Sequence, residues 1–358
     1  MGILELDNCP LSDRNSTYYG MAGQKEGVLI DGEPWIVKYP KNTVGMRGNV
    51  DSYTTAPLSE YIGSHVYEIL GYDVHKTELG CRNDKIVVAC KDFCEYTGQL
   101  VEFRGFKNVY NKELEQVLEM HLSSTGSDQA VELKEILIHL EHNPSLQVIP
   151  GLTDRFWDCI IVDGLINNND RNNGNWGMLR KDGKFCLSPV YDNGAAFANK
   201  VSEASICKRL DNPKSIAESA LNIISIYADN GKNYTFRNLI KECMHYPAFR
   251  AAVKRNVPLI QSRLPEIAKF MEAIPITYKG LLVCSMERRT VYLKDMQVRL
   301  EQLLIPALER ANELDQQAEQ KPLSLTERIA KATAQANALN AGCDAGKAAP
   351  EHGEPERE

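Results

Sequence analysis

The chain has 358 residues, of which 43% are hydrophobic and 25% charged, a composition typical of an ordinary globular protein with enough apolar residues for a core. The formal net charge of -7 provides no bulk attraction to nucleic acid or to an anionic membrane, so neither is expected as a direct partner. The ten cysteines lack paired metal-ligand spacing and are expected to be reduced thiols. The first residues contain neither a basic segment nor a long apolar run, which favours the cytoplasm and leaves open a secreted effector without a cleaved signal.

Residues 17 to about 95 are predicted to form strands around one helix. Two apolar strands, at 28–30 and 35–39, flank an Asp-Gly turn and so predict a β-hairpin. A helix is expected from Pro57 to Gly71, with apolar residues at three-to-four spacing, and a further strand covers 85–89. This predicts a small N-lobe at residues 1–96.

Two features of this region suit a polyphosphate ligand. Gly20, Gly23 and Gly27 bracket a turn whose backbone amides could face phosphates, although such turns are also common without any ligand. Lys38 lies on an apolar strand, where an ammonium group needs an anion unless it reaches water at a strand edge. Glu60 either pairs with Lys38 or is a first-turn glutamate favoured by the helix dipole.

From about residue 100 to residue 318 the hydrophobic pattern is helical, which predicts a large C-lobe at 97–318. The periodic apolar segments lie at 111–122, 129–142, 153–167, 214–228, 233–244, 257–273 and 285–318. Residues 319–358 are rich in Ala, Gln, Glu and Pro, with few large apolar residues, and are predicted to be a partly disordered tail. Truncation after about residue 320 is therefore expected to leave folding unaffected.

The strongest functional signal follows the apolar helix predicted at 153–167, for which Thr153 is the expected N-cap. Phosphoryl transfer from a nucleotide needs a carboxylate that accepts a hydrogen bond from the attacking hydroxyl, together with hard oxygen ligands for magnesium. Asp170 is the candidate for the first role. Asn175 and Asp192 are the candidates for the second.

A hairpin is predicted between these two metal-ligand candidates. Apolar residues alternate on both sides of a Lys-Asp-Gly turn at 181–183, and the resulting hairpin would bring Asp192 back beside Asn175. The competing interpretation is a polar surface loop, because Asn, Asp and Gly are common in loops and D-x-x-x-x-N alone is weak evidence. Three asparagines and an aspartate directly after a buried helix favour a loop that coordinates something.

A strand-borne lysine, a helix glutamate, D-x-x-x-x-N and a later aspartate, in this order, resemble the protein-kinase-like fold. The sequence is similar to that of the HipA-like kinases, bacterial Ser/Thr kinases best known as toxins of toxin–antitoxin pairs. The matching segments are MAGQKEG (21–27), WIVKYP (35–40), SEYIGSHVYEILG (59–71), LINNNDRNNGNWGML (165–179) and LSPVYDNGAAF (187–197). This resemblance covers about residues 17–275 and implies an α+β, bilobal fold with a small β-rich N-lobe and a large helical C-lobe.

The resemblance also implies roles for the catalytic positions. Asp170 would orient the acceptor hydroxyl, and Asn175 and Asp192 would hold Mg²⁺. Lys38 would bind the ATP phosphates, with Glu60 as its partner.

The remaining nucleotide contacts are implied in the same way. The glycine turn would cover the phosphates, and the connection predicted directly after the strand at 85–89 would meet adenine through its backbone. Tyr191 is counted with them because it precedes the metal-binding aspartate in a Tyr-Asp-Asn-Gly run that replaces the usual Asp-Phe-Gly. The residues of the turn are Ala22, Gly23, Gln24 and Lys25, and those of the connection are Cys90, Lys91, Asp92 and Phe93.

Three departures from the larger HipA-like kinases stand out. Those proteins have an extra amino-terminal subdomain, so this chain resembles the short, CtkA-type members. Their autophosphorylated serine aligns here with Tyr19 or Gly20, and autophosphorylation at a nearby residue stays open, with Ser12, Ser16 and Thr17 close upstream. Their histidine near the catalytic aspartate is replaced by Asn172 or Asn173.

The sequence therefore predicts an ATP- and magnesium-dependent protein serine/threonine kinase acting on a protein substrate, and the resemblance adds a small antitoxin-like inhibitor as a potential partner. Two alternatives stay open. A phosphoinositide-type lipid kinase shares D-R-x-x-x-N, but the chain offers no basic amphipathic stretch for an anionic membrane. A non-catalytic pseudokinase would use the long carboxy-terminal helix for a partner, and the presence of all the ionic catalytic groups argues against it.

Overall fold

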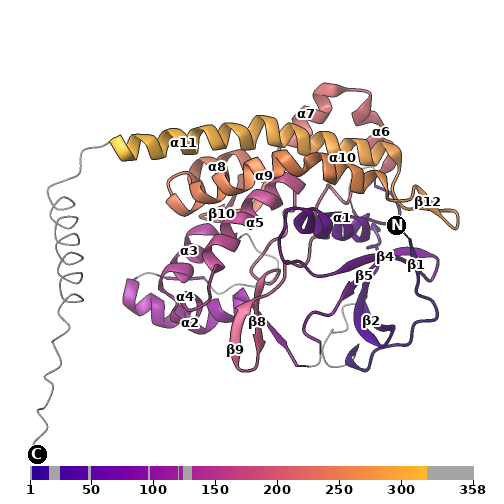
Figure 1. Ribbon diagram of the computed structural model, residues 1–358, viewed down its shortest axis with the longest axis horizontal. Helices are drawn as coiled ribbons and strands as arrows, with labels where there is room; N and C mark the ends of the chain where they lie inside the picture. Colours follow the sequence, from indigo (N-terminus) through magenta and orange to yellow (C-terminus); the bar gives the residue numbers. More distant parts are fainter. Residues whose placement is uncertain are drawn as a thin grey trace, which may run out of the picture. The chain divides into compact units, whose positions relative to one another are not determined.

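The computed structural model describes residues 2–15, 25–46, 50–95, 97–119, 121–123 and 131–320. The chain divides into two compact units, Met1–Ala311 and Asn312–Glu358, and the second is described only as far as Gln320. The first unit is an α+β structure in which a five-stranded sheet with one helix precedes a mainly helical part (Figure 1). The N-lobe boundary after residue 96 stays a prediction, and most of the predicted tail lies outside the described residues.

The amino-terminal sheet has the strand order β1-β4-β5-β3-β2, with β1 parallel to β4 and the other pairs antiparallel. The predicted β2–β3 hairpin is present, and Asp31 and Gly32 have the positive φ angles, 52° and 80°, of a two-residue turn. Strand β5 extends beyond its predicted end at Ala89, so the expectation that the connection after the strand begins at Cys90 was wrong. The strands are β1 (Leu4–Glu5), β2 (Lys25–Ile30), β3 (Glu33–Lys38), β4 (Thr77–Arg82) and β5 (Lys85–Lys91).

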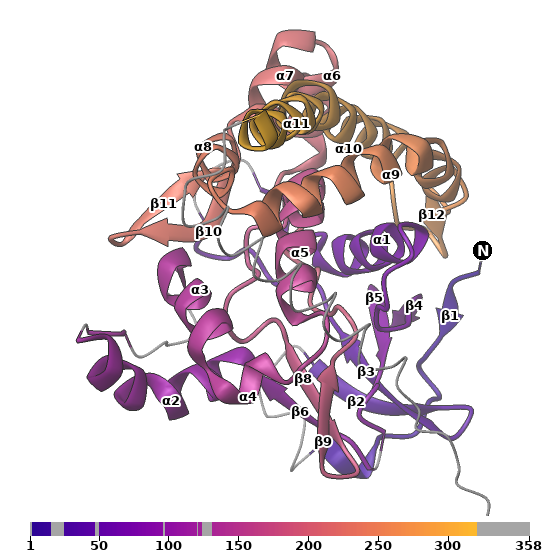
Figure 2. The ribbon, with the colours of Figure 1, turned by 60° about the vertical axis from the view of Figure 1, so that its left-hand side comes forward.

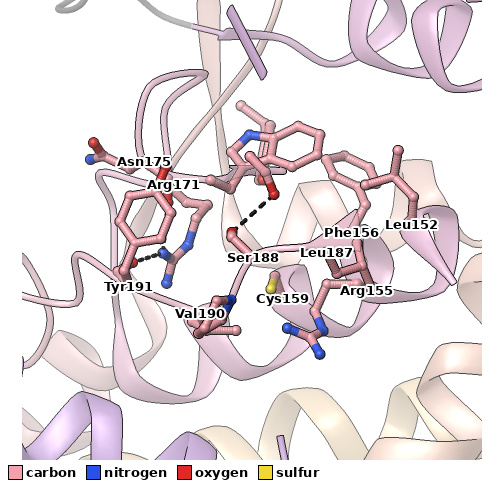
Figure 3. Close-up of a pocket in the computed structure, with 14 residues that line it drawn as sticks. Leu152, Arg155, Phe156, Cys159, Arg171, Asn175, Leu187, Ser188, Val190 and Tyr191 are labelled. Carbon is pink, nitrogen blue, oxygen red and sulfur yellow. Dashed lines mark hydrogen bonds between the residues drawn. The ribbon is translucent and has the colours of Figure 1, made fainter. Parts of the chain in front are cut away.

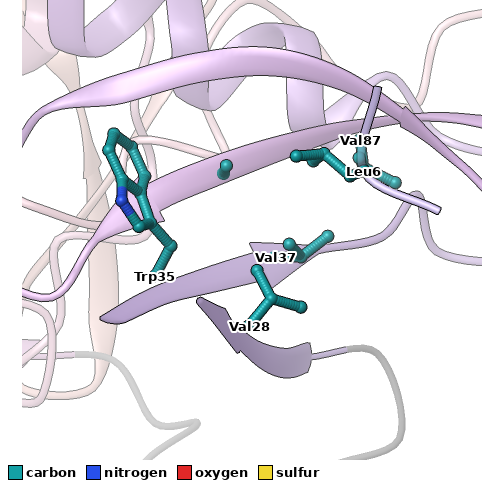
Figure 4. Close-up of a cluster of buried hydrophobic side chains, with 6 residues drawn as sticks. Leu6, Val28, Trp35, Val37 and Val87 are labelled. Atoms are coloured by element: carbon teal, nitrogen blue, oxygen red, sulfur yellow. The ribbon is translucent and has the colours of Figure 1, made fainter. Parts of the chain in front are cut away.

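Alternation along the strands divides this sheet into two chemically different faces. On β3, Trp35 and Val37 point to an apolar cluster that also includes Leu6 (Figure 4). Lys38 points to the opposite face, where it bonds Glu60. Gly80 leaves the space that Leu6 fills, since a Cβ at Gly80 would lie 2.4 Å from Leu6 Cδ1. The buried members of the cluster are Leu6, Val28, Trp35, Val37, Val87 and Ala89.

Helix α1 (Ala56–Ile69) covers the face of the sheet that carries Lys38. Pro57 lies in its first turn and Gly71, with φ of 85°, follows its end, as predicted. The helix is buried between β4 and β5 on one side and α9 on the other (Figure 2). His65 of α1 stacks on Phe270 of α9 with ring centroids 4.6 Å apart, which fixes the helix against the carboxy-terminal part of the unit.

The rest of the described chain is mainly helical, with three small sheets. One sheet contains β6 (Gln99–Glu102), β8 (Gly177–Lys181) and β9 (Lys184–Leu187); a second contains β7 (Val131–Glu132), β10 (Ile224–Asp229) and β11 (Lys232–Thr235); β12 (Thr277–Tyr278) and β13 (Leu281–Leu282) form the third. Short helical turns cover Asp13–Asn15 and, with π geometry, Leu300–Leu304. The α-helices are α2 (Phe103–Leu118), α3 (Leu133–His142), α4 (Pro144–Gln147), α5 (Leu152–Ile166), α6 (Glu203–Leu210), α7 (Pro213–Leu221), α8 (Phe236–Cys243), α9 (Pro247–Glu272), α10 (Met286–Arg299) and α11 (Ile305–Gln320).

Several predicted helix boundaries were wrong. The helix predicted at 214–228 ends at Leu221, because the following residues alternate as a strand and pair with β11 across an Asn-Gly turn. The helix predicted from residue 129 begins at Leu133, after a two-residue strand that pairs with β10. The helix predicted at 257–273 begins at Pro247 and contains two further prolines, Pro258 and Pro265, in its interior. No helix in the described ranges is both long and apolar enough to cross a membrane.

Candidate active site

Helix α5 delivers the catalytic candidate to the surface. Its buried residues include Phe156, Ile160 and Leu165, as the periodicity predicted. The predicted N-cap was wrong, because Gly151 occupies the cap position with φ of 73° and Thr153 lies inside the first turn. The helix ends at Ile166, and the asparagine-rich loop that contains Asp170 follows directly.

Asp170 is exposed in this loop and lines a large cleft. Asn172 donates a hydrogen bond from Nδ2 to Asp170 Oδ1 at 3.0 Å, and its own Oδ1 accepts from the amide of Gly174 at 2.8 Å. Asn175 Nδ2 donates to the carbonyl oxygen of Asp170 at 2.5 Å. Asn172, one of the two asparagines that the resemblance places near the histidine position, therefore orients the Asp170 carboxylate.

The predicted β8–β9 hairpin is present and returns the chain to this loop. Its turn residues Asp182 and Gly183 have φ angles of 50° and 74°. Asp192 follows the hairpin with φ of 60°, a left-handed conformation that is uncommon outside glycine. Its Oδ1 accepts a hydrogen bond from Lys38 Nζ at 2.9 Å, so two residues 154 positions apart meet at the cleft.

Lys38 is a paired lysine, not one that reaches water at a strand edge. Its ammonium lies 2.8 Å from Glu60 Oε2 as well as 2.9 Å from Asp192 Oδ1. Glu60 is 1% exposed, and its other oxygen accepts from the amide of Asn193 at 2.9 Å and lies 3.0 Å from His75 Nε2. Helix α1, the sheet and the segment after the hairpin are joined at this point.

The ionic cluster sets the charge states of its members. Burial alone would lower the pKa of Lys38, but the carboxylates of Asp192 and Glu60 outweigh it and hold that pKa well above its usual value. Burial would raise the pKa of Glu60, yet Lys38 and His75 hold it well below its usual value. Lys38 likewise lowers the pKa of Asp192. At neutral pH the cluster is one ammonium between two carboxylates.

A buried arginine that the sequence analysis did not single out joins the two segments that carry the metal-ligand candidates. Arg171 pairs with Asp163 through two hydrogen bonds, Nε to Oδ2 at 2.8 Å and Nη2 to Oδ1 at 2.9 Å. Its Nη1 donates to the carbonyl of Asn175 at 3.0 Å and to that of Tyr191, and its Nη2 donates to Asn193 Oδ1 at 2.6 Å. The charge of Asp163 inside an apolar helix was the available signal, because a buried carboxylate needs a partner.

The cleft that contains Lys38, Asp170 and Asp192 has a volume of about 1310 Å³. Lys25 also lines it and lies directly opposite Lys38 in the β2–β3 register. The other predicted residues of the glycine turn, Ala22, Gly23 and Gln24, lie outside the described residues.

Two of the four residues of the predicted adenine connection, Cys90 and Lys91, belong to strand β5. Cys90 is buried in β5, where burial raises the pKa of its thiol, and Lys91 ends that strand. The amides of Lys91 and Asp92 already donate to backbone carbonyls, at 2.9 and 3.0 Å. The rings of Phe93 and Tyr191 lie 5.7 Å apart, so Tyr191 lies close to the last residue of the predicted connection.

A second, much smaller cavity lies behind the hairpin (Figure 3). Asn175 and Arg171 line it together with mainly apolar residues, among them Leu152, Phe156 and Val190. Its volume of about 30 Å³ is that of one or two water molecules and excludes a nucleotide. The larger cleft is therefore the candidate nucleotide site.

Glu60, His75 and Cys90 also form a buried group whose potential ligand atoms lie within 4.8 Å of one another. Imidazole and thiol are not the oxygen donors that Mg²⁺ prefers. Glu60 is already bonded to Lys38 and to the amide of Asn193. We interpret Glu60 and His75 as the buried support of Lys38, since His75 Nε2 lies 3.0 Å from the Glu60 oxygen that Lys38 does not bond.

The structure has a bilobal, protein-kinase-like fold. Its features are a small sheet with a paired lysine and glutamate, a mainly helical second part, and two aspartates on one cleft. Comparison with solved structures agrees: the crystal structure of a Helicobacter pylori proinflammatory kinase, CtkA, matches 88% of this chain and 100% of its own chain, with a TM-score of 0.70 and 24% sequence identity. The Shewanella oneidensis toxin–antitoxin HipA, solved with HipB and operator DNA, matches 85% of this chain and 68% of its own, with a TM-score of 0.51 and 12% identity.

Sequence comparison points the same way. The curated serine/threonine-protein kinase CtkA of Helicobacter pylori is 29% identical over 214 residues, which are 59% of this chain. The aligned region spans about three fifths of that relative, 61% of its length. No model of a known protein family matches the chain. The expected resemblance to HipA-like kinases of the CtkA type is thus confirmed.

Proposed function

We propose that this chain is an ATP- and magnesium-dependent protein serine/threonine kinase. The observation that carries the proposal is the meeting of Lys38, Glu60 and Asp192 on the same cleft that Asp170 lines. Sequence similarity to a protein named as a serine/threonine kinase supports it. The proposed reaction transfers the terminal phosphoryl group of ATP to a hydroxyl of a protein substrate.

In this proposal the cleft binds ATP with its phosphates at Lys38. Lys25 reaches the same phosphates because it lies opposite Lys38 across the hairpin. Lys25 and the predicted turn residues 22–24 would cover the phosphates, and the aromatic pair Phe93 and Tyr191 would border the base. Asp192 has a left-handed backbone conformation, which is strained for a residue other than glycine. Such strain is common at functional sites, which supports a role for Asp192 in the reaction.

The donors at the site suit magnesium. Lys38 engages Oδ1 of Asp192, which leaves the carboxylate a second oxygen for a metal, and Asn175 would contribute its amide oxygen from a separate segment. Arg171 bonds the backbone carbonyls of Asn175 and Tyr191 and so fixes the two segments relative to each other. When bound, Mg²⁺ would offset the charge of the polyphosphate.

Asp170 would accept a hydrogen bond from the acceptor hydroxyl and hold it toward the phosphate. Asn172 fixes the direction of the carboxylate through its bond to Oδ1. Autophosphorylation is also part of the proposal, and Ser12, Ser16 and Thr17 are the hydroxyl residues close to the glycine turn in the sequence. Of these, Ser12 is described: it is buried, and its hydroxyl accepts from the amide of Arg14 at 3.2 Å.

We also propose that the protein acts in the cytoplasm on Ser or Thr of another protein. An antitoxin-like inhibitor is a further proposed partner, and its support is the fold-level likeness to HipA, which was solved with HipB. We propose no direct contact with nucleic acid or membrane, because the chain carries a net charge of -7.

The test uses ATP labelled at the terminal phosphate, with generic protein acceptors and phosphoinositide vesicles offered in separate reactions. We expect label in serine and threonine of protein, dependent on magnesium and absent in Asp170→Asn. Label in lipid alone would support the lipid-kinase alternative. A protein that binds no nucleotide would belong to the pseudokinase class.

A further inference from the structure

The cleft is larger and more positively charged than a nucleotide alone requires. Its volume of about 1310 Å³ exceeds the roughly 300–1,000 Å³ of typical small-ligand pockets. Its described lining contains five cations against three carboxylates, a surplus of two positive charges in a chain of net charge -7. The cations are Lys25, Lys38, Lys41, Arg104 and Lys200, and the carboxylates are Glu60, Asp170 and Asp192.

Two of these cations have no role in the proposed nucleotide site. Lys38 is bonded within the ionic cluster, and Arg104 forms an ion pair with Glu102. Lys41 and Lys200 are exposed, and neither forms an ion pair within the described ranges of the chain. They are the cations available to a second ligand.

Backbone hydrogen bonds bring these two lysines to one end of the cleft. The carbonyl of Lys41 accepts from the amide of Thr54 at 2.9 Å, and the amide of Lys41 donates to Thr54 Oγ1 at 3.2 Å. The carbonyl of Asn199, beside Lys200, accepts from the amide of Thr55 at 2.8 Å. Thr54 and Thr55 are adjacent, so both lysines lie beside the start of α1.

This end of the cleft lies beyond the phosphate site. Lys41 follows Lys38 by three positions, about 10 Å along an extended chain. The first turn of α1 contains no acidic residue, and Ala56 and Pro57 in that turn line the cleft. The helix therefore adds the positive end of its dipole to the two lysines.

We propose that Lys41 and Lys200 form a subsite for acidic residues next to the acceptor hydroxyl, so that the substrate class is an acidic segment of a protein. The inference rests on the proposed kinase function. Lys25, Lys38 and the metal ion would face the polyphosphate, which leaves the charges of Lys41 and Lys200 without a counter-charge among the described residues at this end of the cleft. Carboxylates of the substrate supply the missing counter-charge and orient the acceptor toward Asp170.

The experiment compares three peptides of equal length, each with one central serine flanked by Glu, by Gln or by Lys. Phosphorylation by the full chain is measured as kcat/KM at saturating ATP. Binding is measured in parallel by fluorescence anisotropy to the Asp170→Asn protein with ATP and magnesium. We expect the Glu peptide to exceed the Gln peptide by about tenfold in both readouts, with a smaller ratio at high salt.

The double variant Lys41→Gln/Lys200→Gln should reduce the preference for the Glu peptide to about onefold. Its matched control is Lys181→Gln/Lys184→Gln, which removes the same charge from the exposed end of the β8–β9 hairpin and should keep the full preference. The acidic subsite would be overturned by equal binding of the three peptides or by stronger binding of the Lys peptide. It would also be overturned if Lys41→Gln/Lys200→Gln kept the full preference for the Glu peptide.

The two proposals fail in different ways. Transfer to serine without regard to flanking charge overturns the acidic subsite and leaves the kinase proposal standing. Absence of transfer to any acceptor overturns the kinase proposal, and the binding measurements then still decide whether Lys41 and Lys200 select acidic segments.

Discussion

The two faces of the amino-terminal sheet are built from the same strands but have different chemistry. On one face, Leu6, Trp35 and Val37 are at most 4% exposed and touch apolar neighbours. On the other, Lys38 is 20% exposed, and its ion pair with Asp192, itself 35% exposed, borders the cleft. Adjacent positions of β3 thus serve stability and function separately.

This contrast implies that substitutions can separate the two properties. Changes on the apolar face should lower the free energy of unfolding and leave the cleft chemistry intact in the folded fraction. Changes at Asp170 or Asp192 should alter catalysis with a small cost in stability, because those two side chains retain contact with water. The variants below range from the largest expected effect to the smallest.

Asp170→Asn should give the largest effect. It removes the carboxylate that holds the acceptor hydroxyl, and the turnover number should fall by roughly 10² to 10⁴-fold. Nucleotide affinity and the thermal unfolding midpoint should stay close to those of the wild type, because Asp170 is exposed. Single-turnover phosphorylation, calorimetric ATP titration and thermal unfolding measure the three quantities; wild-type turnover would remove Asp170 from the mechanism.

Leu6→Ala is the counterpart on the apolar face. Leu6 is 1% exposed and fills the space above Gly80, so its truncation should lower the free energy of unfolding by about 2–5 kcal/mol. Denaturant titration measures the loss, and kcat should be unchanged under conditions where the variant is folded. A large loss of kcat in folded Leu6→Ala would show that the two faces are coupled.

Arg171→Lys tests the connection behind the cleft. Lysine keeps the charge for Asp163 but cannot bond Asp163, Asn193 and the two carbonyls at once. We expect kcat to fall by about tenfold and the magnesium concentration for half-maximal activity to rise, since loosely positioned groups react more slowly. A purely structural role would lower the unfolding midpoint with no change in the magnesium requirement.

Glu60→Gln should lower the free energy of unfolding by about 1–3 kcal/mol at neutral pH, because the amide has one acceptor oxygen for the two donors, Lys38 Nζ and the Asn193 amide, that the carboxylate satisfies. The folded pKa of Glu60 lies below its usual value of 4.5. The stabilisation by its charge is therefore complete above that pH and is lost as pH falls through the lower folded pKa. Unfolding of both proteins at pH 7 and at acid pH should show the difference shrinking; a difference that grows on acidification would contradict the ion pair.

The sequence predicted those features that depend on local chemistry. Asp-Gly turns identified both functional hairpins, and Pro57 and Gly71 marked the ends of α1. Catalytic candidates could be found because D-x-x-x-x-N followed by a hairpin is a local pattern that the resemblance reinforced. The meeting of Lys38 with Asp192, 154 residues later, followed from that resemblance and not from periodicity.

Other features depend on contacts between distant segments and could not be read in advance. The residues of β10 were predicted as part of a helix. They form a strand because they pair with β11, and that pairing could not be seen in the local pattern. Asn193 and Arg171 join α1 to the asparagine-rich loop. Their roles depend on the packing of four segments: α1, α5, that loop and the segment after β9. The position of Lys200 beside Thr54 and Thr55 likewise follows from a backbone bond across 144 residues.

The central claim is that Asn175 and Asp192 hold a shared divalent cation across from Lys38. Crystals of the protein grown with a non-hydrolysable ATP analogue and Mn²⁺ test it most directly through the anomalous signal of manganese. We expect an anomalous peak within coordination distance of the Asn175 amide oxygen and the Asp192 carboxylate, with the analogue's phosphates beside Lys38. A nucleotide bound elsewhere, or manganese that touches neither residue, would contradict the account.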